Sequence, residues 1–246
     1  MNENTYSVLK AEDVLSGLTY PGRGIVLGVT PNGKYAVAAY FISGRSENSR
    51  NRVFSVSPDG TVKTEPFDLS KVSDPSLIIY NAVRFAGKDL VVTNGDQTDT
   101  VCDGIAEGKT FTEALASRCF EPDAPNFTPR ISGIFYFGKT PRYEMSILKS
   151  VDETGSDCAR YTFSYPMKAG LGHFIRTYEN NGDPLPTFRG EPVRVATDDN
   201  LSVFSEKLWN SLDKENKISL YVRYTDLSDL SYKEKLYNKH DNKHVK

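Results

Sequence analysis

Polar and charged residues gather at the ends of predicted strands and where one strand leads into a predicted helix. The clusters are Ser43 to Ser46, Arg50 to Arg52, Tyr80 with Asn81, Thr93 to Thr100, Thr128 to Arg130, and Tyr178 to Asn180. Guanidinium groups and the N–H groups at the start of a helix both match phosphate oxygens. Together these clusters indicate a site for a phosphorylated small molecule, although each one alone is typical of a solvated surface or a salt bridge.

Other motifs that could do chemistry are incomplete. The glycines between Gly22 and Gly28 miss the spacing of a dinucleotide-binding loop and open a strand rather than a helix. His240 and His244 could share one helical face, but the tail offers no obvious third ligand and indicates a metal site only weakly. His173 has no G-x-S-x-G motif beside it and is interpreted as a structural histidine. We therefore expect neither a metal nor a cofactor.

Composition limits the class of protein. The chain has 246 residues, with 30 Lys and Arg against 32 Asp and Glu, so its formal net charge is −2. This near-neutral balance argues against a nucleic-acid-coating protein. No apolar run approaches the roughly 20 residues that span a bilayer, and the three widely spaced cysteines indicate no disulfide framework. We expect a cytoplasmic protein that binds a small molecule, and no nucleic-acid or membrane partner.

The first third of the chain has the pattern of antiparallel hairpins. Three pairs of β-branched and apolar segments flank turn signals: Gly24 to Thr30 with Lys34 to Ser43, Val53 to Val56 with Thr61 to Glu65, and Leu77 to Phe85 with Asp89 to Thr93. The spacing then becomes helical. Thr98 and Asp99 are expected as N-caps of one helix, and Phe111, Leu115 and Cys119 share one face of a second.

Strand patterns return in the second half. The segments are Ile131 to Phe137, Tyr143 to Leu148, Cys158 to Tyr165 and Phe174 to Tyr178. A loop over Asn180 to Pro192, a helix from about Asn200 and a strand over Ile218 to Tyr224 follow. Strands, helices, strands and a helix indicate one layered α+β domain over residues 1–246, with a frayed, Lys-rich tail over residues 233–246.

At its polar clusters the sequence resembles the archaeal-type inosine monophosphate (IMP) cyclohydrolase family. The matching motifs are Tyr20 to Arg23, Tyr40 to Ser46, Tyr80 with Asn81, Thr93 to Thr100, Phe120 with Glu121, Thr128 to Ile131, and Thr177 to Glu179. The chain resembles a longer, bacterial-like member, with an extension over residues 1–19 and further segments after Pro192. These additions could cover a core edge or build the contact of a homo-oligomer.

The resemblance implies a four-layer αββα sandwich of antiparallel sheets, like that of the N-terminal-nucleophile hydrolases. Those enzymes attack with a freshly exposed N-terminal Ser, Thr or Cys. Here the matching first strand follows Tyr20 to Gly24, a segment that contains none of these residues. We therefore expect no self-cleavage.

The resemblance also implies a reaction of the hydrolase class that acts on cyclic amidines, in purine biosynthesis. Formamido-imidazole-carboxamide ribotide closes to IMP when its carboxamide nitrogen attacks the neighbouring formyl carbon and the carbinolamine loses water. Both groups belong to one molecule, so holding them in the reactive geometry supplies much of the rate. An acid–base group and a partner for the oxyanion complete the chemistry. The alternative is a non-catalytic protein that binds a purine ribotide or nucleotide on the same fold.

Carried over residue by residue, Tyr80, Glu121 and an arginine between Arg45 and Arg52 match family positions linked to the active site. Glu121 would take or relay the amide proton, and Tyr80 would bond the oxyanion or the leaving hydroxyl. Arg45 or Arg52 would polarise the formyl oxygen or hold phosphate, and Arg50 competes with Arg52 for the family position because this segment is longer here. The expected ribotide contacts are Arg23, Ser43, Asn81, Asn94, Gly95, Thr98, Asp99, Arg130, Tyr178 and Glu179.

Each candidate also has a purely structural interpretation. Tyr80 could be an ordinary sheet tyrosine, and Glu121 could merely follow a helix. Thr98 and Asp99 could be only helix caps, and Asn94 to Gly95 only a turn that ends a strand.

Overall fold

Two sheets of seven strands each form the centre of the computed structural model, which describes residues 6–72 and 79–240. The first sheet has the order β1-β12-β11-β2-β3-β13-β14, with strands at Leu9–Lys10, Val193–Ala196, Leu171–Arg176, Arg23–Val29, Tyr35–Ser43, Lys217–Asp226 and Tyr232–Asn238. The second has the order β10-β9-β8-β7-β6-β5-β4, with strands at Cys158–Pro166, Arg142–Ser150, Arg130–Tyr136, Asp89–Thr93, Tyr80–Ala86, Val62–Glu65 and Val53–Val56. Neighbouring strands are antiparallel except β1 and β12. The expected α+β class with antiparallel sheets is confirmed.

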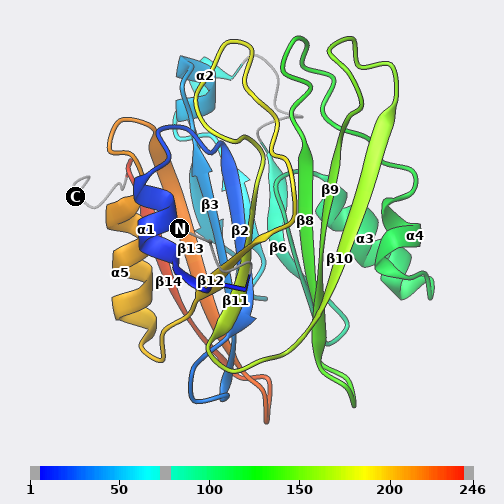
Figure 1. The fold of residues 1–246 in the computed structure, drawn as a ribbon, viewed down its shortest axis with the longest axis vertical. Helices are drawn as coiled ribbons and strands as arrows, with labels where there is room; N and C mark the ends of the chain where they lie inside the picture. Colours follow the sequence, from blue (N-terminus) through cyan, green and yellow to red (C-terminus); the bar gives the residue numbers. More distant parts are fainter. Residues whose placement is uncertain (1–5, 73–78, 241–246) are drawn as a thin grey trace.

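Helices cover the outer face of each sheet, whereas α2 (Glu47–Arg50) lies at the upper ends of the strands (Figure 1). The helical segments are α1 (Ala11–Ser16), α2 (Glu47–Arg50), α3 (Gln97–Ala106), α4 (Phe111–Leu115), α5 (Leu201–Ser211) and the short 3-10 helix η1 (Leu69–Lys71). One apolar cluster joins α1 and α5 to the first sheet, and another joins α3 and α4 to the second. The sheets themselves face each other, so the packing order is helices, sheet, sheet, helices.

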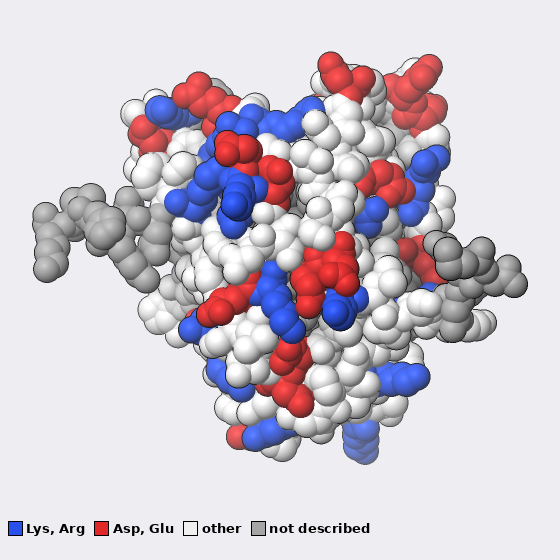
Figure 2. Space-filling model, turned by 60° about the vertical axis from the view of Figure 1, so that its left-hand side comes forward, with Lys and Arg blue, Asp and Glu red and all other residues white. Residues whose placement is uncertain are grey.

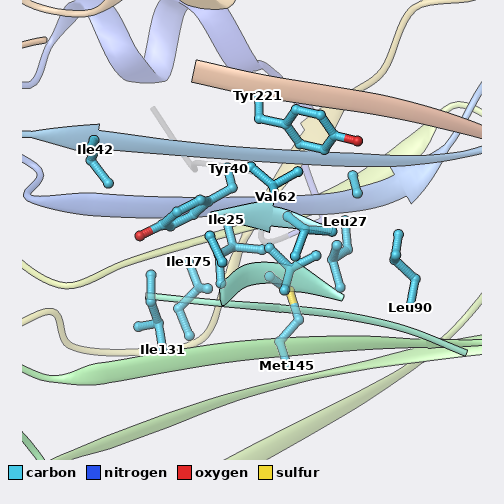
Figure 3. Packing of buried hydrophobic residues seen from close by; sticks show 14 of the residues in the cluster. Ile25, Leu27, Tyr40, Ile42, Val62, Leu90, Ile131, Met145, Ile175 and Tyr221 are labelled. Carbon is cyan, nitrogen blue, oxygen red and sulfur yellow. The ribbon is translucent and has the colours of Figure 1, made fainter. Parts of the chain in front are cut away.

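The largest apolar cluster fills the space between the sheets (Figure 3). Ile25 and Leu27 of β2 face it, whereas Val26 between them faces α1 and α5. This alternation follows from the period of two in a strand. Because both faces of the sheet are covered, β2 is buried throughout, and after Arg23 it is apolar instead of alternating with polar residues. Tyr40 belongs to the same cluster, and its hydroxyl extends from the edge of it (Figure 3).

The predicted hairpins form where the turn signals place them. β2 pairs with β3, β4 with β5, and β6 with β7. The third hairpin begins at Tyr80, and residues 77 and 78 of the predicted strand lie outside the described residues. The whole second sheet comes from one continuous segment, Val53 to Pro166, between the strands of the first.

The expectation of a frayed tail from Lys233 is wrong up to Asn238. Residues Tyr232–Asn238 form β14, which pairs with β13 at the edge of the first sheet. The Tyr221 hydroxyl on β13 donates to Glu234 on β14 at 2.5 Å, and the buried Arg223 guanidinium donates to the same carboxylate at 3.3 Å. These bonds attach a strongly charged segment that its composition alone does not predict as a strand. Residues 241–246, including His244, lie outside the described part of the chain.

The two middle helices begin and end differently from the prediction. α3 begins at Gln97, so Thr98 and Asp99 lie in its first turn and do not cap it. α4 ends at Leu115, because Ala116 and the residues after it leave the helix, and Cys119 is therefore exposed beyond its end. The helix expected from about Asn200 is α5, and Asn200 caps it, since its side chain accepts from the backbone N–H groups of Ser202 and Val203.

The surface carries mixed charge. Figure 2 shows Lys and Arg interspersed with Asp and Glu on the side that carries α1 and α5. Within residues 6–72 and 79–240, no helix combines the length and the apolar character that crossing a bilayer requires.

Candidate active site

A cavity of about 240 Å³ lies near α2, between the segments that follow β3, α4 and β11. Its lining is strongly polar: Tyr20, Arg23, Arg45, Ser46, Asn48, Ser49, Arg52, Glu121, Asp123, Asn126, Thr128, Tyr178 and Leu185. Five residues expected from the sequence are therefore brought together here, namely Arg23, Arg45, Arg52, Glu121 and Tyr178.

Arg23 enters the cavity from the first residue of β2. The preceding Gly22 has a φ of 72°, and a Cβ on it would lie 2.2 Å from Thr177 Oγ1, so only glycine fits. The same hydroxyl accepts from the Arg23 backbone N–H at 3.1 Å. The Thr177 N–H in turn donates to the Arg23 carbonyl at 3.0 Å. Arg23 is thereby fixed at its backbone while its side chain is 7% exposed.

Arg52 enters from the segment between α2 and β4. Ser46 caps α2 by accepting from the Ser49 N–H at 3.1 Å. Asn51 is held at the next turn, because its amide donates to the Asp68 carbonyl at 2.8 Å and accepts from the Asp68 N–H at 2.7 Å. The Arg52 side chain beyond this clamp is 6% exposed.

Each of the two buried guanidinium groups has one N–H that lacks a hydrogen-bond partner within the described residues. The Nε atoms of Arg23 and Arg52 are buried and unpartnered within the described residues. A buried donor without a partner costs free energy, and two neighbouring cations cost more. Burial lowers the pKa of Arg52, and Arg23 beside it lowers that pKa further. Such a pair is typical of a site that is completed by an anionic or strongly polar ligand.

Glu121 supplies the buried negative charge in this cavity. Its backbone N–H donates to the Thr128 carbonyl at 2.9 Å, which fixes it at the base of the loop before β8. Burial raises the pKa of the Glu121 carboxyl, while Arg23 and Arg130 act in the opposite direction. Burial also lowers the pKa of Arg23, but Glu121 and neighbouring tyrosines outweigh it and the net shift is upward. Arg23 and Glu121 therefore form a buried pair of opposite charge on the lining of the cavity.

Tyr80 stands behind the arginines rather than on the cavity lining. It begins β6, is 6% exposed, and lies close enough to Arg23 and Arg52 to raise the pKa of both. Its hydroxyl lies 2.8 Å from that of Tyr40 on the opposite sheet. Burial holds the pKa of Tyr40 well above its usual range, so this phenol keeps its hydrogen.

Tyr178 forms another wall with its neighbours Thr128 and Asp123. The Tyr178 and Thr128 hydroxyls lie 2.5 Å apart. Thr128 also donates to Asp123 twice, from its hydroxyl at 2.5 Å and from its N–H at 2.6 Å. The Tyr178 ring stacks on Tyr20 at 6.0 Å.

Arg45 lies at the exposed mouth of the cavity, and Arg50 points away from it. The Nη1 atom of Arg45 donates to Asn181 Oδ1 and to the Gly182 carbonyl, both at 2.7 Å, and its guanidinium lies over the Tyr20 ring. Arg50 donates to the Gly44 carbonyl at 3.1 Å and lines a separate hollow that also contains His240. His240 stacks there on Phe67. Of the two arginines that compete for the family position, Arg52 is the one in the cavity.

Four predicted contact residues instead build the junction of β7, α3 and β8. Asn94 accepts from the Ile131 N–H and donates to the Pro129 carbonyl, both at 2.9 Å. Thr98 lies 2.7 Å from the Thr93 hydroxyl. Arg130 donates to Asp96 and to Gln97, and a Cβ on Gly95 would lie 2.6 Å from its Nη1. None of the four is on the cavity lining, but Arg130 still acts on Glu121 through its charge.

The other four predicted contacts also lie off the cavity lining. Asn81 donates to Asp99 at 2.9 Å, and Asp99 accepts from Arg84 at 2.8 Å in a different hollow. Ser43 ends β3, where its N–H donates to the Gly22 carbonyl at 2.7 Å. Glu179 accepts from Arg176 at 2.8 Å. Their polar groups are used inside the fold.

Several lining residues were not predicted as contacts: Tyr20, Ser46, Asn48, Ser49, Asp123, Asn126, Thr128 and Leu185. A signal existed for some of them, since Tyr20, Ser46 and Thr128 belong to motifs that resemble the family. Asp123 and Asn126 lie between two of these motifs, Phe120 with Glu121 and Thr128 to Ile131. The sequence does not predict Leu185 as a lining residue, because it is distant in the chain from the loop that it contacts. Its N–H donates to Asn126 Oδ1 at 3.0 Å.

Comparison with known proteins shows the family to which the chain belongs. The model of a family described as IMP cyclohydrolase-like protein matches residues 20–229, a range that includes every lining residue. A Methanococcus maripaludis protein named IMP cyclohydrolase is 35% identical over 169 residues, covering 65% of this chain and 75% of its own. A Methanocaldococcus jannaschii protein of the same name is 37% identical over 166 residues, covering 65% and 73%. This chain belongs to the IMP cyclohydrolase-like family.

Proposed function

We propose that this chain is an IMP cyclohydrolase, which closes formamido-imidazole-carboxamide ribotide to IMP with loss of water. The observation that carries the proposal is the pair of buried arginines, Arg23 and Arg52, that share a cavity with one buried carboxylate, Glu121. Ring closure needs these two functions, a cationic partner for a developing oxyanion and a group that moves a proton. The ribotide is the partner that such a cavity would take.

The arginines are proposed to act on the formyl oxygen. This oxygen gains negative charge when the carboxamide nitrogen attacks the formyl carbon. Arg52 would stabilise that charge, and Arg23 beside it would add to the field. Their N–H groups without protein partners are available for this purpose and need not break a bond first. Preorganised donors of this kind contribute about 100- to 1,000-fold each to a rate.

Glu121 is proposed to take the proton that the carboxamide nitrogen loses. An amide nitrogen is a weak nucleophile, so removing its proton during attack lowers the barrier. A base works best when its pKa lies near the working pH. Burial moves the pKa of Glu121 upward, which is the useful direction for a carboxylate base. Glu121 would then give this proton to the carbinolamine oxygen. The second hydrogen of the departing water would come from the formamido N–H, which is lost as the C=N bond of the new ring forms.

Tyr80 is proposed to bond the oxyanion or the leaving hydroxyl. Tyr40 can donate to Tyr80 across 2.8 Å, and this arrangement leaves the Tyr80 hydrogen free for the substrate. Arg45 is proposed to meet the phosphate, because it lies at the open mouth with Ser46 and Ser49, while Arg52 lies inside. Both side-chain hydrogen bonds that Arg45 makes within the described residues come from Nη1, so the remaining edge of its guanidinium could approach an anion.

We further propose that the facing sheets with outer helices are a sandwich of the N-terminal-nucleophile hydrolase type that works without processing. The first residue of β2 is Arg23, which cannot serve as the nucleophile of that class. Mass spectrometry of an active preparation tests this proposal. An uncut chain is the expected result, and a cut before a Ser, Thr or Cys would contradict it.

The decisive assay mixes purified protein with the formylated ribotide in the presence of a chelator and follows IMP formation against the spontaneous reaction. Acceleration supports the proposal. If the protein binds IMP but does not accelerate closure, the chain is instead a non-catalytic ribotide-binding protein. Arg50→Lys, a change outside the cavity, serves as the control for general effects of substitution.

A further inference from the structure

The hydrogen bonds among Asp123, Thr128 and Tyr178 have a fixed direction. An ionised carboxylate only accepts hydrogen bonds, and a hydroxyl has a single hydrogen to donate. Thr128 gives its hydroxyl hydrogen to Asp123 Oδ2, while its backbone N–H occupies Oδ1. The bond between Thr128 and Tyr178 must therefore be donated by Tyr178.

This direction leaves the Tyr178 oxygen with only lone pairs to offer. The ring is 1% exposed, and burial raises the pKa of its phenol, so the hydrogen stays on the oxygen. Among residues 6–72 and 79–240, the hydroxyl makes one hydrogen bond, the one to Thr128. Tyr178 nevertheless lines the cavity.

We infer that Tyr178 is a specificity residue that accepts a hydrogen bond from a donor group of the ligand, with its direction set by Asp123 through Thr128. The inference rests on the proposed function and adds one feature to it. Arg23 and Arg52 offer only donors to a ligand, whereas this wall offers an acceptor. A ligand that carries only acceptors would bond the arginines but would offer no donor to the lone pairs of the Tyr178 oxygen.

The ribotide carries two kinds of donor that could meet Tyr178. One is the carboxamide N–H that remains as N1–H in IMP, and the other is a ribose hydroxyl. Both present the same chemistry to a phenol oxygen. Analogues of IMP that lack one donor each can distinguish them: 1-methyl-IMP, 2′-deoxy-IMP and 3′-deoxy-IMP.

The test measures binding of IMP and these three analogues to the wild-type protein and to Tyr178→Phe by calorimetry. One lost hydrogen bond between neutral groups should weaken IMP binding about three- to tenfold. For the analogue that lacks the relevant donor, the same substitution should change affinity less than about twofold. The identity of that analogue tells which donor Tyr178 accepts from.

Asp123→Asn reverses the direction of the bonds and provides a second, independent variant. Asn Oδ1 must still accept from the Thr128 N–H, so Asn Nδ2 faces the Thr128 hydroxyl and donates to it. The Thr128 hydrogen then turns to Tyr178, and the Tyr178 hydrogen turns into the cavity against the ligand donor. IMP should bind about tenfold more weakly or worse, whereas the analogue that lacks the donor should lose much less. A merely structural role of Asp123 would weaken all four ligands alike.

One matched control completes the design. Tyr143→Phe removes another buried phenol, one bonded to His173 at 2.6 Å away from the cavity, and should leave IMP binding unchanged. Equal losses for IMP and all analogues in Tyr178→Phe and Asp123→Asn would overturn the inference alone. A wild-type protein that neither binds IMP nor closes the ribotide would overturn the proposed function as well.

Discussion

The hydroxyl oxygens of Tyr40 and Tyr80 lie 2.8 Å apart and join β3 of the first sheet to β6 of the second. Both residues are buried, so this bond is protected from water. It lies behind Arg23 and Arg52 and orients the phenol that we propose to meet the leaving hydroxyl. The position of Tyr80 therefore depends on how the two sheets are packed.

Tyr40→Phe should lower the single-turnover rate of IMP formation about three- to tenfold and leave KM nearly unchanged, because Tyr80 loses its orienting partner but stays in place. Tyr224→Phe is the matched control, since Tyr224 is equally buried on the opposite face of the first sheet. Equal rates for wild type and Tyr40→Phe would show that the bond between the tyrosines has no catalytic role.

Arg52→Lys should reduce kcat/KM for ring closure about 100-fold or more, because one ammonium cannot reproduce the fork of donors beside the formyl oxygen. Arg50→Lys should stay within about twofold of the wild type, since Arg50 lines a different hollow. Steady-state kinetics of the two variants decide which arginine is used. A greater loss in Arg50→Lys would reverse the assignment.

Glu121→Gln should lower kcat about 100-fold or more, since general base catalysis contributes at least that factor. The wild-type rate should fall toward low pH, because a base acts only when ionised. Burial raises the pKa of Glu121 from 4.5, so this loss should be centred above pH 4.5. A pH profile of kcat/KM measures it, and in Glu121→Gln the acidic limb should be absent. Persistence of the same limb would exclude Glu121 as its origin.

His173 should make stability depend on pH. Its Nδ1 lies 2.6 Å from the Tyr143 hydroxyl, its ring stacks on Tyr165 at 3.5 Å, and it is 4% exposed. Burial, with Arg194 nearby, lowers its pKa from 6.5 to about 4. The unfolded chain thus takes up a proton first, so this contribution is complete above pH 6.5 and is lost as pH falls toward about 4.

Between pH 7.5 and 5.5, the loss from this group should be about 1.4 kcal/mol of unfolding free energy. Urea unfolding at the two pH values measures it, and His173→Gln should show a decline smaller by that amount. The glutamine side chain keeps an acceptor for Tyr143, which limits the other effects of the substitution. An unchanged pH dependence in the variant would mean that His173 does not titrate in this window.

Local signals predicted most of the fold. The hairpin at Pro31 to Gly33 and the start of a helix near Asn200 are determined by residues close to them, and both occur as expected. β12 and β14 could not be predicted in the same way, because they are edge or near-edge strands whose stability comes from pairing with distant segments. β14 is strongly charged, and β12 is a short strand that directly follows a segment with Gly190 and Pro192. Pairing with the neighbouring strand holds each of them in the extended conformation.

The site could be predicted as a set of charged residues but not as a geometry. Arg23 and Glu121 belong to motifs that resemble the family, and Arg52 competes with Arg50 for a family position. All three of Arg23, Glu121 and Arg52 line the cavity. Asn94, Thr98 and Asp99 belong to a motif that equally predicts ligand contacts, yet their side chains form hydrogen bonds with other parts of the fold. A polar residue that stabilises a junction and one that binds a ligand can be of the same type. Only the hydrogen bonds that each makes in the folded structure distinguish them.

The order of strands along the chain also sets an order of assembly during synthesis. The second sheet is complete once Pro166 has left the ribosome, whereas the first still lacks β11 to β14 at that moment. Arg23 and Glu121 have been synthesised by then, but Tyr178 and β11, which pairs with β2, have not. A nascent chain that has reached Pro166 therefore contains Arg23 and Glu121 but cannot yet form the complete cavity. A chain truncated there would lack Tyr178 and β11 to β14.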